Sequence, residues 1–247
     1  MNKSKIDWCD MTWNVVTGCL HGCEYCYAEA MVRRFGNPEY ATGEIHVNEN
    51  SASEGLYPYG FDPTLHRYKL DLPKNTKIPQ RVFVTSMGDL FGEWVPDKWI
   101  GYVFDSCADA RDHTYMFLTK NPARYHALKK AGLLPHGENC WFGFTATNQE
   151  DFEKAWRASA WMDYYSFVSI EPLRGEIDIT IEKRIQWVIV GAQTGSRAKE
   201  NVPERAWIEK IVSDCRDMQI PIFMKNNLRS AWGAPLIQQF PSCMKQV

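Results

Sequence analysis

Short runs of consecutive apolar residues recur from residue 81 onward, and polar residues follow each run. The runs lie at 82–86, 115–118, 141–144, 167–170, 187–190 and 220–224. A strand that is apolar at every position is buried on both faces, as in a parallel sheet covered by helices. Counting a first strand within 6–16, about seven strands alternate with helices. The sequence therefore predicts an α/β fold, a closed or partial (β/α) barrel with mostly parallel strands and helices outside, and a doubly wound open sheet is the alternative.

Helix-forming segments separate most of these runs. We expect helices at 27–35, 96–110, 122–131, 149–161 and 203–218. Proline suits the first turn of a helix, and Gly36-Asn37-Pro38 is a stop signal. Residues 37–79 show no sustained period, so we expect an irregular insertion there, with a short helix near 63–69. The whole chain, 1–247, is predicted to be one domain carrying this insertion.

Composition narrows the function classes. A net charge of -2 excludes a protein that coats nucleic acid through bulk electrostatics, although a local basic groove stays open. The sequence contains no apolar run long enough to span a membrane and no signal peptide. We expect a cytoplasmic protein that is a monomer or a weak dimer.

Three of the eight cysteines, Cys19, Cys23 and Cys26, stand in the spacing C-x₃-C-x₂-C. The motif falls on a loop between the first strand and the helix at 27–35. Thiolates this close repel one another unless a cation lies between them, so the motif indicates a metal or iron–sulfur site. Three ligands leave one coordination position open for chemistry. The isolated cysteines Cys107, Cys140, Cys215 and Cys243 are expected to be buried small hydrophobes.

A zinc site is the alternative for the same cysteines. Structural zinc takes four ligands, and Cys9 or His21 would have to complete the set. An electron-transfer iron–sulfur cluster also normally takes four cysteines. Both alternatives therefore need a fourth ligand in addition to the three cysteines.

Polar residues stand directly after nearly every predicted strand. Parallel strands end at a common edge, where β/α folds bind ligands, so these residues predict an active site. They are Ser86, Gly88, Asp89, Thr119, Lys120, Asn121, Thr145, Thr147, Asn148, Ser169, Glu171, Gly191, Gln193, Thr194, Lys225 and Asn226. For Thr119, Thr147 and Asn148, capping of the next helix is an equally good explanation.

The cysteine motif, with Tyr25 before its last cysteine, resembles that of the radical S-adenosylmethionine superfamily. The resemblance implies that Cys19, Cys23 and Cys26 bind a [4Fe–4S] cluster. Its fourth iron would bind S-adenosylmethionine, and one electron would cleave that cofactor to a 5′-deoxyadenosyl radical. Segments 13–19, 26–29, 86–91, 169–173 and 187–191 also resemble a phage-associated three-Cys-motif family, formerly of unknown function.

The resemblance also implies roles for the other polar residues. Contacts with the adenine are assigned to Tyr25 or Tyr27, Gly191 and Gln193, and contacts with the methionine amino group to Gly88 and Asp89. Thr145, Thr147 and Glu171 would contact the ribose, a carboxylate or the substrate. Lys120 and Lys225 would bind anionic groups of the cofactor or substrate.

The phage context of the resembling family implies a nucleobase or nucleotide substrate, for example an amino-acid-decorated thymine in phage DNA hypermodification. An isomerase or lyase of this kind would need an external electron donor, and it would act in an infected or prophage-bearing bacterial cell. Tyr57, Tyr59, Phe61 and Tyr68 could stack on bases, although ordinary loop packing explains them as well. The alternative from another class is a non-catalytic zinc- or cluster-binding module that recognises nucleic acid.

Overall fold

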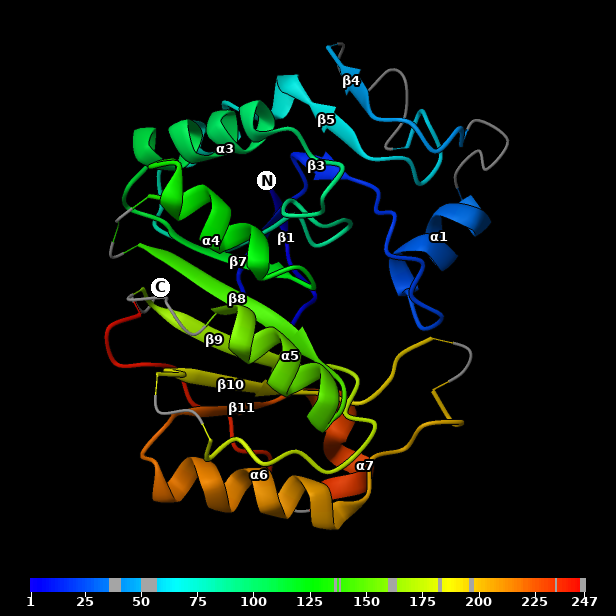
Figure 1. The fold of residues 1–247 in the computed structure, drawn as a ribbon, viewed down its shortest axis with the longest axis vertical. Coiled ribbons are helices and arrows are strands. Elements are labelled where there is room, and N and C mark those ends of the chain that lie inside the picture. The colour runs from blue at the N-terminus through cyan, green and yellow to red at the C-terminus, as the bar shows by residue number, and fades with distance from the viewer. Residues whose placement is uncertain are drawn as a thin grey trace.

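An eight-stranded sheet in the order β1-β2-β6-β7-β8-β9-β10-β11 forms the centre of the computed structural model (Figure 1). The structure describes residues 1–35, 41–49, 57–135, 137, 139–159, 164–181, 184–195, 198–233 and 235–244. The strands are β1 Asn2–Lys3, β2 Met11–Trp13, β6 Arg81–Val84, β7 Thr114–Thr119, β8 Cys140–Ala146, β9 Ser166–Ile170, β10 Trp187–Val190 and β11 Ile222–Met224. All neighbours from β2 to β11 pair in parallel, and β1 is antiparallel to β2.

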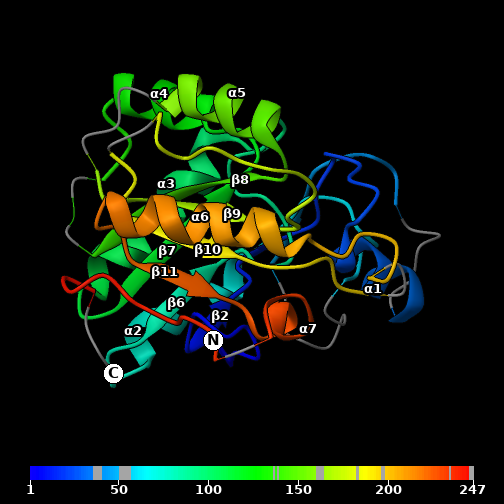
Figure 2. The same cartoon turned by 90° about the horizontal axis from the view of Figure 1, so that it is seen from below.

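The helices lie outside this sheet. They are α1 Tyr27–Phe35, α2 Leu72–Asn75, α3 Asp97–Asp109, α4 Ala123–Lys130, α5 Gln149–Ser159, α6 Arg205–Asp217 and α7 Arg229–Trp232. Figure 2 shows α4, α5 and α6 along one side of the strands and α1 apart from them. The predicted α/β fold and partial barrel are confirmed, and β1 and β11 remain the two ends of the described sheet. The predicted stop at 36–38 and the last residues of the helix at 149–161 fall outside the described residues. None of the described helices is long and apolar enough to cross a membrane.

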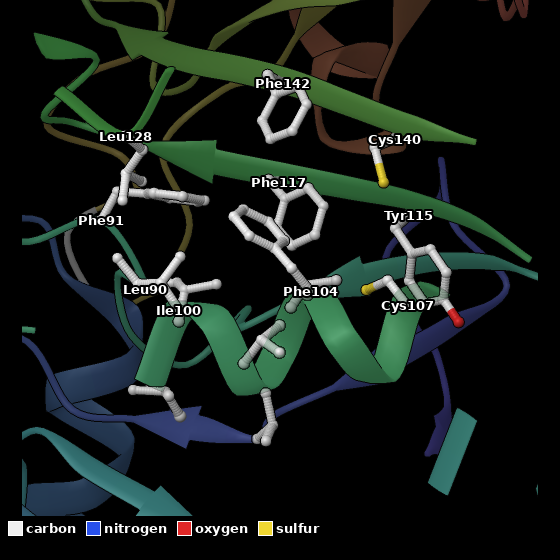
Figure 3. Close-up of a cluster of buried hydrophobic side chains, with 14 of the residues drawn as sticks. Leu90, Phe91, Ile100, Phe104, Cys107, Tyr115, Phe117, Leu128, Cys140 and Phe142 are labelled. Atoms are coloured by element: carbon white, nitrogen blue, oxygen red, sulfur yellow. The ribbon is translucent and has the colours of Figure 1, made fainter. Parts of the chain in front are cut away.

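The strands that are apolar at every position pack into two different hydrophobic cores, one on each face of the sheet. In β7, Tyr115 and Phe117 join an outer core with α3 and α4, whereas Met116 belongs to an inner core on the other face of the sheet. Figure 3 shows the outer core, where Phe117 stacks on Phe142 with ring centroids 5.3 Å apart and meets the edge of Phe104. A second outer core lies between α5, α6 and the strands β8 to β11.

Aromatic side chains fill the inner core at the N-terminal end of the sheet. The ring centroid of Trp8 lies 4.6 Å from that of Phe83 and 6.2 Å from that of Trp187, which it meets edge to face. Trp187 and Trp99 are buried and Trp94 is half-buried, as expected of packing residues, while Trp161 lies outside the described residues. The N-terminal segment thereby closes the bottom of the barrel.

The insertion is built differently from its prediction. β3 (Val16–Thr17), β5 (Thr64–His66) and β4 (His46–Asn48) form a second small sheet beside α1 (Figure 1). The helix predicted near 63–69 is wrong in its first half, because residues 64–66 pair with both β3 and β4. Only Arg67–Lys69 turns, as a single 3₁₀ turn. The predicted burial of the isolated cysteines holds for Cys107, Cys140 and Cys215, but Cys243 is exposed, since Met244 fills the inner core in its place.

His66, in β5, is expected to make the stability of the protein fall in acid. The side chain is fully buried, and its Nε2 lies 2.8 Å from Thr17 Oγ1. Burial, followed by the charge of Lys69, lowers the pKa of His66 from 6.5 to about 3. The unfolded chain therefore takes up a proton near pH 6.5, whereas the folded chain does not until about pH 3. The contribution of His66 to the free energy of unfolding is therefore fully present above pH 6.5. It falls by about 2 kcal/mol between pH 6.5 and pH 5.

Urea unfolding of wild type and His66→Gln between pH 7.5 and pH 5 measures this loss. The variant should show a flatter pH dependence, whereas His126→Gln, at an exposed histidine of α4, should keep the wild-type slope. Equal slopes for wild type and His66→Gln would contradict the expectation.

Candidate active site

A cavity of about 480 Å³ opens at the C-terminal ends of the strands. Such a volume suits a nucleotide-sized ligand. Of the predicted site residues, those in its wall are Cys19, Cys23, Tyr25, Cys26, Tyr27, Ser86, Gly88, Asp89, Thr119, Lys120, Thr145, Ser169, Glu171, Gln193, Thr194, Lys225 and Asn226. The fold thus brings together residues that are more than 200 positions apart in the sequence.

The start of the cysteine loop packs between the backbone at Phe61–Asp62 and the backbone at Met87–Gly88. Gly18 donates its N–H to Met87 O at 2.9 Å, and Cys19 donates its N–H to Phe61 O at 3.1 Å. Gly18 has a φ of +83°, and a Cβ there would lie 2.2 Å from Asp62 O. A Cβ at Gly88 would lie 2.6 Å from Gly18 O. Gly88 therefore has a structural use, the close approach of the two loops, besides the cofactor contact predicted for it.

A backbone N–H group points at one of the three sulfurs. Cys26 Sγ accepts the N–H of Glu29, in the first turn of α1, at 3.4 Å. Burial, Asp89 and the other two thiols raise the pKa of Cys19 to about 12. Burial also raises the pKa of Cys23, against the effect of Lys120. Thiols in this setting become thiolates when a cation binds them, and N–H···S bonds are a feature of iron–sulfur sites.

Cys9 and His21, the two candidates for a fourth zinc ligand, both form hydrogen bonds with other protein side chains. Cys9 lies in the inner core, and its thiol donates to Ser4 Oγ at 3.1 Å. His21 Nε2 donates to Asp89 Oδ2 at 2.8 Å. Among the residues that the structure describes, no three His, Cys, Asp or Glu side chains, the three motif cysteines included, are grouped closely enough to hold a single metal ion. The binding of a larger iron–sulfur cluster by these cysteines therefore stays a prediction.

Asp89 joins the cysteine loop to the neighbouring strand end. It is 4% exposed, and its Oδ2 accepts from His21 Nε2, Thr119 Oγ1 and the Lys120 N–H at 2.8, 2.9 and 3.0 Å. Its Oδ1 accepts the Phe91 N–H at 2.9 Å. The carboxylate is therefore bound on both oxygens by protein groups, and its contact with a methionine amino group stays a prediction.

Lys120 and two tyrosines surround the cysteines. The Lys120 ammonium lies 5.7 Å from the ring centre of Tyr25, and the Arg174 guanidinium lies 5.3 Å from it. Burial alone would lower the pKa of Lys120, but Tyr25, Cys23, Asp89 and Cys19 raise it above its usual value. The ammonium is therefore held charged beside the thiols.

Tyr27 lines the cavity near both Cys26 and Glu171. Its hydroxyl donates to Ser86 O at 2.8 Å. Burial of that hydroxyl, followed by the nearby Glu171 and Cys26, raises its pKa, although one edge of the side chain is exposed. Tyr27 thus connects the thiol end of the cavity with the end that holds Glu171.

Glu171 and Lys225 form an ion pair of 2.7 Å in the cavity wall. Gly191, on the strand between them, does not line the cavity but makes this contact feasible. A Cβ at Gly191 would lie 2.9 Å from Lys225 Cδ and 3.0 Å from Glu171 Cγ.

Thr147 and Gln193 are held by other protein groups. Thr147 is absent from the cavity wall, and its hydroxyl donates to Asp151 at 2.5 Å. It belongs to the cap at the start of α5, where Asn148 Oδ1 also accepts the Asp151 N–H at 2.9 Å. The helix-cap explanation is the better one for Thr147. Gln193 does line the cavity, and its Oε1 accepts from Asn201.

Three cavity residues, Thr85, Ser169 and Asp7, received no predicted role from the sequence. Thr85 has a φ of +59°, which is rare for a β-branched residue, and its buried hydroxyl has no partner among the described residues. Ser169 stood among the polar strand ends but was given no role. Asp7 enters because the N-terminal segment folds back, and its carboxylate accepts both the N–H and the Nδ2 of Asn226, 219 residues away.

The family model described as "Protein of unknown function (DUF5131)" matches residues 3–238. This chain belongs to that family. No curated protein matches the sequence.

Among solved structures, a point mutant of spore photoproduct lyase aligns with this DUF5131 protein at a TM-score of 0.55 and 10% identity, over 90% of this chain and 78% of that one. Spore photoproduct lyase complexed with dinucleoside spore photoproduct aligns at 0.47 and 13% identity, over 85% and 62%. A mutant with bound AdoMet and the same dinucleoside aligns at 0.43 and 11%, over 85% and 54%. At 10% identity, the first of these alignments shows a likeness of fold alone.

Proposed function

We propose that this DUF5131 protein is a radical S-adenosylmethionine enzyme. The observation that carries the proposal is that Cys19, Cys23 and Cys26 line one cavity together with the polar ends of the strands. The fold that the chain shares with spore photoproduct lyase supports it. Three sulfur ligands with one open position suit a cluster that binds a cofactor.

The protein's own groups would prepare the site in three ways. The three thiols would hold a [4Fe–4S] cluster, which when bound supplies one electron for cleaving S-adenosylmethionine to a 5′-deoxyadenosyl radical. The N–H group of Glu29 would stabilise the anionic sulfur of Cys26, and the backbone around Cys19 is fixed by its own N–H bond to Phe61 O. Lys120, whose side chain lines the cavity, adds a positive charge beside them, suited to a carboxylate.

We infer further that the substrate is a nucleobase or nucleotide, modified or rearranged by isomerase or lyase chemistry. Trp8, Phe61 and Phe83 supply apolar cavity wall, and Ser169 and Thr145 supply hydroxyls. Aromatic and hydroxyl groups together recognise bases. The phage context of the resembling family favours a base in phage DNA hypermodification, such as an amino-acid-decorated thymine. An external electron donor and a cytoplasmic location in the bacterial host belong to the same proposal.

Anaerobic purification tests this function against the zinc-binding alternative. The protein should be brown and contain about four irons per chain, with zinc well below one. A colourless protein with one zinc per chain after anaerobic reconstitution would refute the proposal and favour a non-catalytic nucleic-acid module.

A further inference from the structure

The end of the cavity away from the cysteines has a defined polar centre. The strands β9, β10 and β11 place Ile170, Val190 and Met224 in adjacent register. The next residues, Glu171, Gly191 and Lys225, therefore stand side by side at the C-terminal edge of the sheet. Lys225 also donates its N–H to Val190 O at 2.9 Å, which fixes this register beyond the strand.

The same face of the sheet carries hydroxyls one row deeper. Thr145, Ser169 and Ile189 are register neighbours, and side chains two positions apart on a strand share a face. Thr145 and Ser169 both line the cavity. The ion pair therefore stands above a partly polar floor, with Trp8 and Phe83 as apolar wall.

The ion pair leaves hydrogen-bonding capacity unused. Lys225 Nζ donates to Glu171 Oε2, and in the described part of the chain Oε1 is buried without a partner. The ammonium carries three N–H donors, and Glu171 is its one hydrogen-bond acceptor among the described residues. The terminal torsion of a glutamate is broad, so Oε1 can turn toward the cavity while Oε2 keeps the lysine. An unpaired buried carboxylate oxygen favours a ligand that donates to it.

An acceptor directly beside a donor complements one kind of base edge. Thymine, uracil and guanine each present a ring N–H next to a C=O. The N–H would donate to Glu171 Oε1, and the C=O would accept from Lys225 Nζ. Cytosine presents an unprotonated ring nitrogen at the corresponding position, which would face the carboxylate unfavourably.

We propose that Glu171 and Lys225 form a subsite for a nucleobase that presents an N–H beside a C=O. Gly191 lets the two side chains meet, and the Tyr27 hydroxyl lies near both Glu171 and Cys26. This inference rests on the proposed nucleobase substrate and names which base edge the site selects.

Binding of nucleosides to anaerobically reconstituted protein with S-adenosylmethionine tests the subsite. Thymidine, 3-methylthymidine and deoxycytidine are the probes, followed by saturation-transfer NMR and calorimetry. Thymidine should bind at least about tenfold more tightly than either analogue, because one charge-assisted hydrogen bond is lost with each. Absence of saturable thymidine binding, or equal binding of thymidine and 3-methylthymidine, would overturn the proposal.

Variants separate this subsite from the cofactor site. Glu171→Gln and Lys225→Met should each weaken thymidine binding at least about tenfold. Gly191→Ala should do the same by separating the pair. The subsite replaces the cofactor contacts that the resemblance assigned to Glu171, Gly191 and Lys225. Iron content and the affinity for S-adenosylmethionine should therefore stay at the wild-type level in all three variants. Lys210→Met, which removes a lysine paired with Asp214 on α6 at 2.6 Å, is the matched control and should leave thymidine binding unchanged.

Two outcomes distinguish the levels of inference. If Glu171→Gln loses S-adenosylmethionine affinity and keeps thymidine affinity, the pair serves the cofactor and the subsite is refuted. If wild-type protein binds no iron but discriminates thymidine from 3-methylthymidine, the radical mechanism fails and the subsite stands.

Discussion

Replacing Cys23 with alanine should remove the bound iron and abolish cleavage of S-adenosylmethionine. Cys23 is half-buried at the cavity, and two thiolates alone would leave the cluster without one of its three protein ligands. The side chain supports no core, so the free energy of unfolding of the apoprotein should change by less than about 1 kcal/mol. Iron analysis, the visible spectrum and urea unfolding of the apoprotein measure these effects.

Two other cysteine variants are the controls. Cys243→Ala changes an exposed cysteine and should leave iron binding unaltered. Cys9→Ala removes a thiol that donates to Ser4 in the inner core, so it should lower stability but retain about four irons per chain. Loss of metal in Cys9→Ala would indicate a four-cysteine site and contradict the three-ligand assignment.

Of the glycine-to-alanine substitutions near the site, Gly18→Ala should reduce stability and iron binding most. Alanine at a φ of +83° costs about 1–2 kcal/mol by itself. The new Cβ would also meet Asp62 O at 2.2 Å and Phe61 O at 2.6 Å, so the cysteine loop has to leave its place against the insertion. We expect a loss of about 3 kcal/mol or more in stability, together with a large loss of bound iron.

Gly22→Ala is the matched control in the same loop. Gly22 has a φ of +64°, and a Cβ there meets nothing within 4 Å. Its cost should be limited to the backbone term of about 1 kcal/mol, with iron retained. Equal effects of the two substitutions on iron content would show that contact with the insertion does not position Cys19.

Strand patterning made the main sheet predictable from the sequence. The segments at 141–144 and 187–190 are apolar throughout because each strand packs against helices on one face and against the aromatic inner core on the other. A buried parallel strand carries this signal locally, without its partners.

The insertion lacked any comparable signal. The strands Val16–Thr17 and His46–Asn48 are two and three residues long, too short to show a period. They exist because both pair with Thr64–His66. Such pairings depend on tertiary contacts that no window of sequence contains.

Some residues of the candidate site could also be predicted from the sequence, whereas others depend on tertiary contacts. Residues directly after a strand, such as Lys120 and Glu171, were foreseeable because strand ends meet at one edge. The contribution of Asp7 depends on the N-terminal segment folding back onto Asn226. The engagement of Asp89 with His21 and the contact across Gly191 are likewise tertiary facts.

Release of 5′-deoxyadenosine tests the central claim most directly. Anaerobically purified protein would be incubated with dithionite and S-adenosylmethionine, and the nucleoside would be measured by liquid chromatography and mass spectrometry. Wild-type protein should release 5′-deoxyadenosine and methionine, and Cys23→Ala should release neither. Iron-loaded wild-type protein that releases no 5′-deoxyadenosine, or a Cys23→Ala variant that releases as much as wild type, would contradict the account.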